Sequence, residues 1–310
     1  VCSLPAPVWD LFSAADVYAA AASSLSHEAT REFRFHGALL DSHALGLQDT
    51  WAIAAAPAEI KSQQLVLRGV VYAAVFNPND GRKNWHDTLW AFCWAFRDNA
   101  AATLLIKLVH HDANFACEIL LHEMKKIAPY QCRVVAIHGF LNDKTYKELI
   151  NSATYVVNSS HGEGQCLPLM EFMSAGKPAL APDHTAMSDY ITGENAFIVR
   201  SSPEWTHWPH DPRLVLRAFR YRLDWQSLFD AYSESYRVAT MQPQRYQLMS
   251  QTASKALQAH CSHKVIRAGL QRFLSRLGVD ARNATPPGAI TQFFFDGIAP
   301  LIHRVRLNHD

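Results

Sequence analysis

Six short apolar runs alternate with longer amphipathic stretches between residues 69 and 200. Uninterrupted apolar character over so few residues is typical of strands that are buried on both faces. The runs cover 70–77, 103–109, 133–140, 154–160, 177–181 and 195–199, and the stretches between them cover 84–98, 113–128, 143–153, 168–175 and 184–191. Strands that alternate with helices predict βαβ units, and therefore an α/β fold with a doubly wound parallel sheet, Rossmann-like in architecture.

The sequence on either side of this region has a different character. Apolar positions from Trp205 to Tyr232 lie in arginine-rich sequence, and further apolar spacing continues to about residue 277. We therefore expect 201–310 to be a helical C-terminal extension that packs on the sheet domain of residues 69–200. Residues 1–68 suggest a helix and strand near 12–24 and another pair near 51–60, and they are too few for a second full Rossmann domain.

Composition excludes several classes of function. The chain of 310 residues is 49% hydrophobic and 18% charged, as expected of a globular protein, and its net charge of +1 gives no reason to expect a nucleic-acid partner. Its six cysteines contain no Cys-x-x-Cys pair, which favours buried free thiols and a cytoplasmic, reducing location. No apolar run reaches the roughly 18 residues of a membrane span.

Polar, basic or glycine residues follow the ends of four predicted strands, the fourth of which is followed by the loop that contains Gly164. Arg82 and Lys83 lie in the turn after the first strand, and Lys107 lies near the end of the second. Gly139 and Phe140 follow the third strand. The carboxyl ends of parallel strands meet at one edge of a sheet, where ligands bind. Cations beside a helix N-terminus predict a site for phosphate or diphosphate, with backbone N–H groups from the loop at Gly164, Gln165, Cys166 and Leu167.

Two acids accompany these cations, eight positions apart. Glu163 lies in the loop after the fourth strand, and Glu171 lies in the helix that Pro168 begins. Carboxylates in a phosphate site accept hydrogen bonds from hydroxyl-rich groups, as in the ribose sites of dinucleotide-binding folds. We therefore expect a nucleotide joined through diphosphate to a sugar. His161, next to this loop acid, either contacts the substrate or caps the loop.

Residues 161–181 resemble the Glu-x7-Glu segment of retaining GT-B glycosyltransferases of the family-four, or group 1, type. The matching residues are Glu163, Gly164, Leu167, Pro168, Glu171, Met173, Ala175, Gly176 and Pro178. The resemblance implies that 69–200 is the C-terminal, donor-binding domain of such an enzyme and that 1–68 is a truncated remnant on the acceptor side. It departs from the family at Cys166, which stands where the family has a second glycine, and at the adjacent Arg82 and Lys83, which the family separates by several residues.

The resemblance also implies roles for the site residues. Glu163 would contact the transferred sugar and Glu171 the ribose, while Lys107, with Arg82 or Lys83, would neutralise the leaving diphosphate. The segment with Gly139 and Phe140 would meet the nucleobase. The donor would be UDP- or GDP-linked, with no divalent metal or other cofactor.

The expected function is transfer of a hexose from this donor to a saccharide or lipid-linked acceptor. A lipid-linked acceptor would bring the protein to the inner face of a membrane as a peripheral partner. The alternatives are a non-catalytic nucleotide-sugar-binding module or fragment of a larger enzyme, and, less favoured, an epimerase or a phosphorylase. The histidines of 110–111 and 207–210 lack the spacing of metal ligands and are expected in loops.

Overall fold

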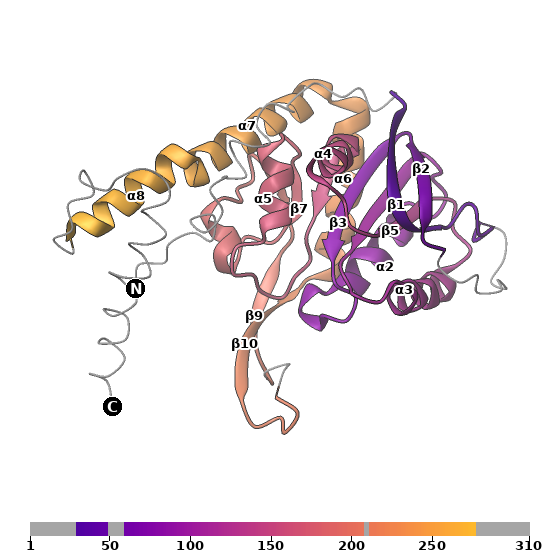
Figure 1. Ribbon diagram of the computed structural model, residues 1–310, viewed down its shortest axis with the longest axis horizontal. Coiled ribbons are helices and arrows are strands. Elements are labelled where there is room, and N and C mark those ends of the chain that lie inside the picture. The colour runs from indigo at the N-terminus through magenta and orange to yellow at the C-terminus, as the bar shows by residue number, and fades with distance from the viewer. Residues whose placement is uncertain (1–28, 49–58, 208–210, 277–310) are drawn as a thin grey trace. The chain divides into compact units, whose positions relative to one another are not determined.

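An eight-stranded sheet forms the core of the larger unit of the chain (Figure 1). The computed structural model describes residues 29–48, 59–207 and 211–276. The strands follow the order β2-β1-β5-β4-β3-β6-β7-β8, and the six from β3 to β8 pair in parallel. Their bounds are β1 Arg31–Asp41, β2 Lys61–Leu67, β3 Val70–Phe76, β4 Ala102–Leu108, β5 Arg133–His138, β6 Tyr155–Val157, β7 Ala179–Ala181 and β8 Ala196–Ile198. The predicted α/β fold with a parallel sheet is confirmed.

The helices between the parallel strands begin and end close to their predicted positions. They are α2 (Trp85–Ala95), α3 (Ala113–Ile127), α4 (Asp143–Ser152) and α5 (Leu167–Ser174), while the short stretch before β8 forms the 3-10 helix η4 (Thr185–Asp189). Side-chain caps set two of the starts, since Asp112 and Asn142 each accept a hydrogen bond from the backbone N–H three residues on.

An aromatic cluster joins the sheet to the C-terminal helix α6 (Trp225–Met241). Tyr72 of β3 contacts Phe92, Tyr155 and Tyr232 with ring centroids 5.2–5.7 Å apart. Its buried hydroxyl also lies 3.0 Å from the hydroxyl of Ser235. The cluster therefore fixes α6, and α7 (Pro243–Cys261) follows α6 directly.

The N-terminal segment forms part of this sheet, so the boundary predicted at residue 69 does not separate two bodies. β1 pairs antiparallel with both β5 and β2. Buried and exposed positions alternate along Arg31–Gly37, which is the period of a strand. The buried Arg31 donates to the carbonyl of Gly69, just before β3. The acceptor-side role of residues 1–68 stays a prediction, and the stretches 12–24 and 51–58 lie outside the described residues.

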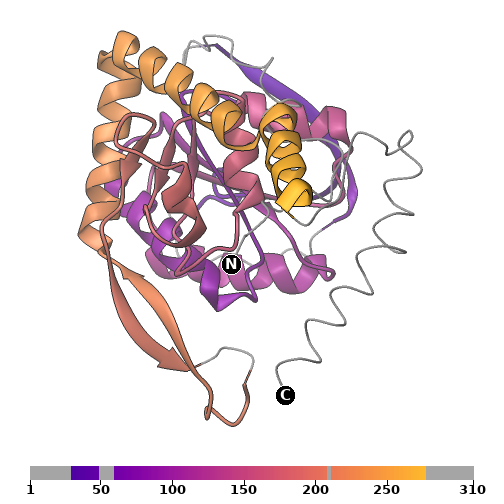
Figure 2. The same cartoon turned by 90° about the vertical axis from the view of Figure 1, so that its left-hand side faces the viewer.

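Residues 201–223 form a β-hairpin, and the prediction of helix for this stretch is wrong. β9 (Ser201–His207) and β10 (Arg217–Leu223) pair antiparallel, and Trp205 lies opposite Phe219. From Phe219 to Leu223 the arginines of β10 alternate with apolar residues, as a two-sided strand requires. Helix begins only at Trp225, as predicted for the rest of this region. Figures 1 and 2 show the hairpin extending away from the sheet.

The chain divides into two compact units, the larger of which is Pro5–His263. The described part of the other unit lies in helix α8 (His263–Arg276), and the expected packing of the tail after residue 280 falls outside the described residues. Within the ranges that the structure describes, no helix is long and apolar enough to cross a membrane.

Candidate functional site

Two loops at the carboxyl edge of the parallel sheet lie side by side. The first follows β3 and contains the short 3-10 helix η3 (Gly81–Lys83), and the second follows β6 and leads into α5. The backbone N–H of His161 in the second loop donates to the carbonyl of Arg82 in the first at 2.9 Å. This bond connects the loops that follow the neighbouring strands β3 and β6, which pair in parallel. The predicted cations and the predicted acid therefore lie close together.

Glu163 is the centre of the site and holds two cations. Its carboxylate lies 2.6 Å from Lys83 Nζ and 2.9 Å from Arg82 Nη1, and it accepts a hydrogen bond of 2.6 Å from the hydroxyl of Ser160. The side chain is only 5% exposed. Burial acts to raise the pKa of Glu163, but Lys83, Ser160 and Arg82 outweigh it and hold the pKa below its ordinary value.

The turn around η3 aims both cations at the same carboxylate. Asp80 caps η3 by accepting from the backbone N–H of Arg82 at 3.1 Å, and its other oxygen accepts from Arg82 Nη2 at 3.0 Å. Asn84 then adopts a left-handed conformation with φ of 48° before α2 begins. Adjacent residues 82 and 83 therefore converge on Glu163, and Lys83 is the more buried of the two, at 18% exposure against 40% for Arg82.

Cys166 occupies a backbone conformation that favours glycine. Its φ of 60° and ψ of 63° are left-handed, and it precedes the first residue of α5. The thiol is buried and accepts a hydrogen bond of 2.7 Å from the side-chain amide of Asn158. Burial raises the pKa of Cys166 to about 12, so the thiol is protonated at neutral pH and is not a reactive nucleophile. The other described cysteines (Cys93, Cys117, Cys132 and Cys261) are likewise buried, as predicted.

Glu171 has an environment separate from that of Glu163. It lies on α5, and the hydroxyl of Tyr146 on α4 donates to its carboxylate at 2.5 Å. Leu167 at the start of the helix is 42% exposed. In the loop before it, Gly164 has open space around its Cα, and Gln165 accepts a hydrogen bond of 2.7 Å from the hydroxyl of Tyr190 through its carbonyl. The two acids thus contact different groups, and their separate tasks stay a prediction.

The remaining predicted residues lie at the same edge but do not bond to Glu163. Lys107 Nζ donates to the carbonyl of Leu108 at 2.9 Å, and burial lowers the pKa of Lys107 to about 8. Phe140 is 90% exposed. A Cβ at Gly139 would lie 2.5 Å from the backbone oxygen of His36, so the close approach of β1 requires glycine here.

The hairpin supplies site contacts that the sequence analysis missed. Tyr221 of β10 donates its N–H to the carbonyl of His161 at 2.9 Å, and its own carbonyl lies 2.8 Å from His161 Nδ1. The ring of Tyr221 also stacks on His184, with centroids 4.4 Å apart. Next to His184, the hydroxyl of Thr185 accepts from the N–H of Glu163 at 3.0 Å. The alternation of apolar residues and arginine over 219–223 was the signal that could have placed Tyr221 here.

No group of three or more His, Cys, Asp or Glu side chains in the described ranges is placed to hold a metal ion. His110 instead contacts the backbone of Asp112, and His207 contacts the carbonyl of Leu214 at 2.8 Å.

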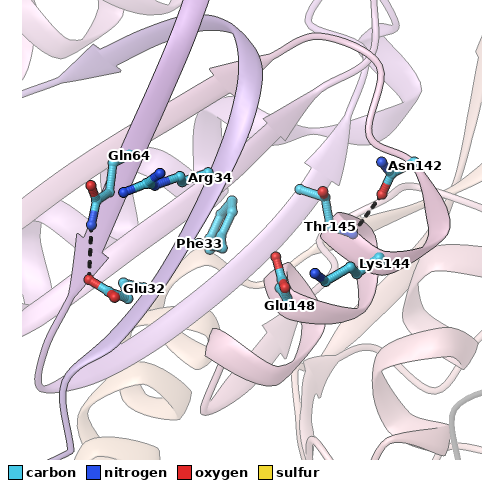
Figure 3. A pocket seen from close by; sticks show the side chains of 8 residues that line it. All are labelled: Glu32, Phe33, Arg34, Gln64, Asn142, Lys144, Thr145 and Glu148. Carbon is cyan, nitrogen blue, oxygen red and sulfur yellow. Dashed lines mark hydrogen bonds between the residues drawn. The ribbon is translucent and has the colours of Figure 1, made fainter.

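A separate pocket of about 400 Å³ lies between the β1–β2 pair and the start of α4 (Figure 3). Its lining mixes both signs of charge with amides, one hydroxyl and one ring, and consists of Glu32, Phe33, Arg34, Gln64, Asn142, Lys144, Thr145 and Glu148. None of the predicted site residues belongs to this lining.

These observations define an α/β protein with a charged cluster at the carboxyl edge of its parallel sheet, where open sheets of this class bind ligands. Residues 116–207 match the family model described as "Glycosyl transferases group 1". The matched segment runs from α3 to the end of β9 and contains both Glu163 and Glu171. No curated protein matches the chain.

Several solved structures resemble the chain weakly. The C-terminal domain of a glycosyl transferase group 1 family protein (LpcC) from Francisella tularensis is 14% identical with a TM-score of 0.44, over 62% of this chain and 87% of that one. Sucrose-phosphate synthase from Thermosynechococcus elongatus is 17% identical with a TM-score of 0.47, over 67% of this chain and 45% of that one. Anabaena Alr3699/HepE in complex with UDP and glucose is 13% identical with a TM-score of 0.47, over 67% and 48%. The chain thus spans less than half the length of the last two, and likenesses this weak carry no argument about its chemistry.

Proposed function

We propose that this chain is the donor-binding part of a group 1 glycosyltransferase that uses a nucleotide-sugar donor. The observation that carries the proposal is the convergence of Arg82 and Lys83, from the loop after β3, on Glu163 in the loop that leads into α5. The loop and helix also lie inside the segment that matches the family model. Two cations beside a helix N-terminus suit a diphosphate, and an acid in the same place suits a sugar hydroxyl.

Each part of the donor has candidate partners in this proposal. The diphosphate binds Arg82, Lys83 and the backbone N–H groups at the start of α5, with Lys107 as a further cation. Glu171 accepts from the ribose hydroxyls, beside Tyr146. The exposed ring of Phe140 is available to stack on a uracil or guanine base.

The reaction that we propose is hexosyl transfer with retention of configuration, without a metal ion. The bond between the anomeric carbon and the diphosphate oxygen breaks, and the nucleoside diphosphate leaves with the bonding electrons. The acceptor hydroxyl oxygen forms the new bond to the anomeric carbon, and its proton passes to an oxygen of the leaving diphosphate. Arg82 and Lys83 stabilise the charge that develops on the diphosphate, which is where such a reaction needs stabilisation most.

Glu163 has two successive roles in this proposal. In the described structure, its buried carboxylate neutralises Lys83 and Arg82. A bound diphosphate competes for these same cations and displaces the carboxylate of Glu163. This carboxylate then accepts a hydrogen bond from a hydroxyl of the transferred sugar. The acceptor is a saccharide or a lipid-linked saccharide, and the proposed location is the cytoplasm.

A second candidate is a module that binds the nucleotide sugar without transferring the sugar. It is favoured by the pairing of both cations with Glu163, which already satisfies their charge.

Calorimetric titration of the chain with UDP and with GDP tests the donor site. We expect one of the two nucleotides to bind and Glu171→Ala to weaken that binding. The control is Glu204→Ala, which removes an acid on the hairpin and should leave the binding unchanged. If neither nucleotide binds, the donor site is wrong. Hydrolysis or transfer of a sugar from the matching donor then separates the enzyme from the non-catalytic module.

A further inference from the structure

The tip of the β9–β10 hairpin exposes three consecutive apolar side chains. Leu214, Val215 and Leu216 are 59%, 66% and 53% exposed. They lie at the end of the hairpin that extends from the sheet in both views (Figures 1 and 2). Scattered single apolar residues are normal on a protein surface, but a contiguous run at a projecting tip marks an interaction site.

This tip is held in place by a buried carboxylate. Asp211 accepts hydrogen bonds from the backbone N–H groups of Arg213, Val215 and Leu216 at 3.1, 3.0 and 2.8 Å. The backbone at Leu214 has a φ of 54°, a left-handed conformation that is unfavourable for a branched side chain. The tip therefore displays its apolar side chains in a fixed, strained turn, and strain of this kind is a reason to look for function.

The apolar surface continues from the tip along one face of the hairpin. Trp205 and Phe219 pair edge to face with centroids 5.3 Å apart, and they are 72% and 52% exposed. Phe219 in turn contacts Tyr221, which lies at the base of the hairpin beside His161. Tryptophan, whose ring is apolar with one polar N–H, is characteristic of the boundary between lipid and water, and phenylalanine adds apolar area beside it.

Positive charge flanks this apolar surface. Residues 201–223 contain four arginines against two acids, which leaves a surplus of two positive charges. Arg213 and Arg217 flank the three apolar residues on either side. Arg217 is exposed and has no ion pair among the described residues, whereas Arg220 and Arg222 share Glu204. Anionic headgroups complement such a surplus.

We infer that the hairpin tip docks on an anionic lipid bilayer, with Leu214–Leu216, Trp205 and Phe219 at the acyl boundary and Arg217 among the headgroups. A nucleic acid would suit the arginines but not the apolar tip, and a small anion would not need the aromatic face. Because Tyr221 bonds directly to His161, docking would hold the loop of Glu163 at a fixed height above the lipid surface. The inference does not depend on the proposed donor.

Sedimentation of the full chain with lipid vesicles tests this inference. One set of vesicles is phosphatidylcholine alone, and the other also contains phosphatidylglycerol. We expect binding to the anionic vesicles that weakens with added salt. Val215→Glu should lower it about tenfold or more, as expected from the transfer energy of one valine side chain. Arg217→Gln should lower it about fivefold, on the anionic vesicles only.

A matched control is Leu248→Glu, because Leu248 on α7 is 65% exposed, almost the same as Val215. We expect this variant to bind vesicles like the unchanged chain, and thermal unfolding shows whether each variant stays folded. The inference is overturned if the chain binds neither kind of vesicle, or if Val215→Glu and Leu248→Glu weaken binding equally. It is also overturned if Val215→Glu only abolishes self-association, which would assign the tip to a protein contact.

Discussion

Glu163→Gln is the substitution that most directly tests the electrostatics of the site. It keeps the shape of the side chain but removes the negative charge that Lys83 and Arg82 share. Both cations then lie beside a neutral amide, and Lys83, which is 18% exposed, cannot recover its full hydration. We therefore expect the free energy of unfolding to fall.

The exposure of the three side chains sets the magnitude. Removing one member of a buried ion pair costs about 3–5 kcal/mol, whereas a solvent-exposed pair contributes about 1 kcal/mol or less. Glu163 with Lys83 is close to the buried case, and Arg82, at 40% exposure, is close to the exposed one. We expect a loss of about 3–5 kcal/mol for the two contacts together, because the buried contact with Lys83 sets most of it.

The effect depends on pH in a direction set by the pKa shift. The pKa of Glu163 is lower in the folded protein than its ordinary value of 4.5. The carboxylate thus contributes its full stability above pH 4.5, and this contribution is lost as the pH falls through the folded pKa. The difference between the unchanged chain and Glu163→Gln should therefore shrink under acid conditions.

Urea unfolding followed by far-ultraviolet circular dichroism measures this difference, at neutral pH and in acid. Glu204→Gln is the control, because Glu204 also meets two cations but is 28% exposed against 5% for Glu163. We expect it to lose under about 1 kcal/mol. If Glu163→Gln destabilises no more than Glu204→Gln at neutral pH, the buried ion-pair reasoning fails.

Three further predictions concern other residues of the site. Cys166→Gly should be about 1–2 kcal/mol more stable than Cys166→Ala in urea unfolding, because the backbone at residue 166 is left-handed. The control is Ala153→Gly, which should destabilise the protein because Ala153 has an ordinary φ of −78°. Glu171→Gln should weaken UDP or GDP binding about tenfold but leave the affinity for inorganic diphosphate unchanged, since only the nucleotide has a ribose; equal losses would assign Glu171 to phosphate. Affinity for diphosphate should fall as the pH rises through about 8, where Lys107 loses its proton, and Lys107→Met should remove this step in a titration series; a step that persists belongs to another group.

The alternation of strands and helices was predictable from local patterns. The apolar runs of β3 to β8 and the spacing of Trp85, Leu89 and Phe92 in α2 each depend on a few neighbouring residues. The location of Arg82, Lys83 and Glu163 at one edge of the sheet was also predictable, because parallel strands place their carboxyl ends there. These residues are separated by about 80 positions in the chain, and the topology alone brings them together.

Other features depended on contacts that no local pattern specifies. β1 carries a clear alternation over Arg31–Gly37, but its place beside β5 follows from the close approach of Gly37 and Gly139. The hairpin was mistaken for a helix because aromatic and arginine residues suit either period when the partner strand is unknown. The burial of Glu163, and with it the direction of its pKa shift, likewise follows from packing around the loop.

The sequence by itself determined the α/β class, the order in which strands and helices alternate along the chain, and the candidate acids and cations. It could do so because hydrophobic period and turn chemistry act over short distances. The tertiary structure alone decided that Glu163 neutralises both cations, that Tyr221 joins the site across 60 positions, and that residues 201–223 project as a hairpin. The physical reason is that strand pairing and desolvation depend on which distant residues come into contact, and their free energy appears only when the chain has folded.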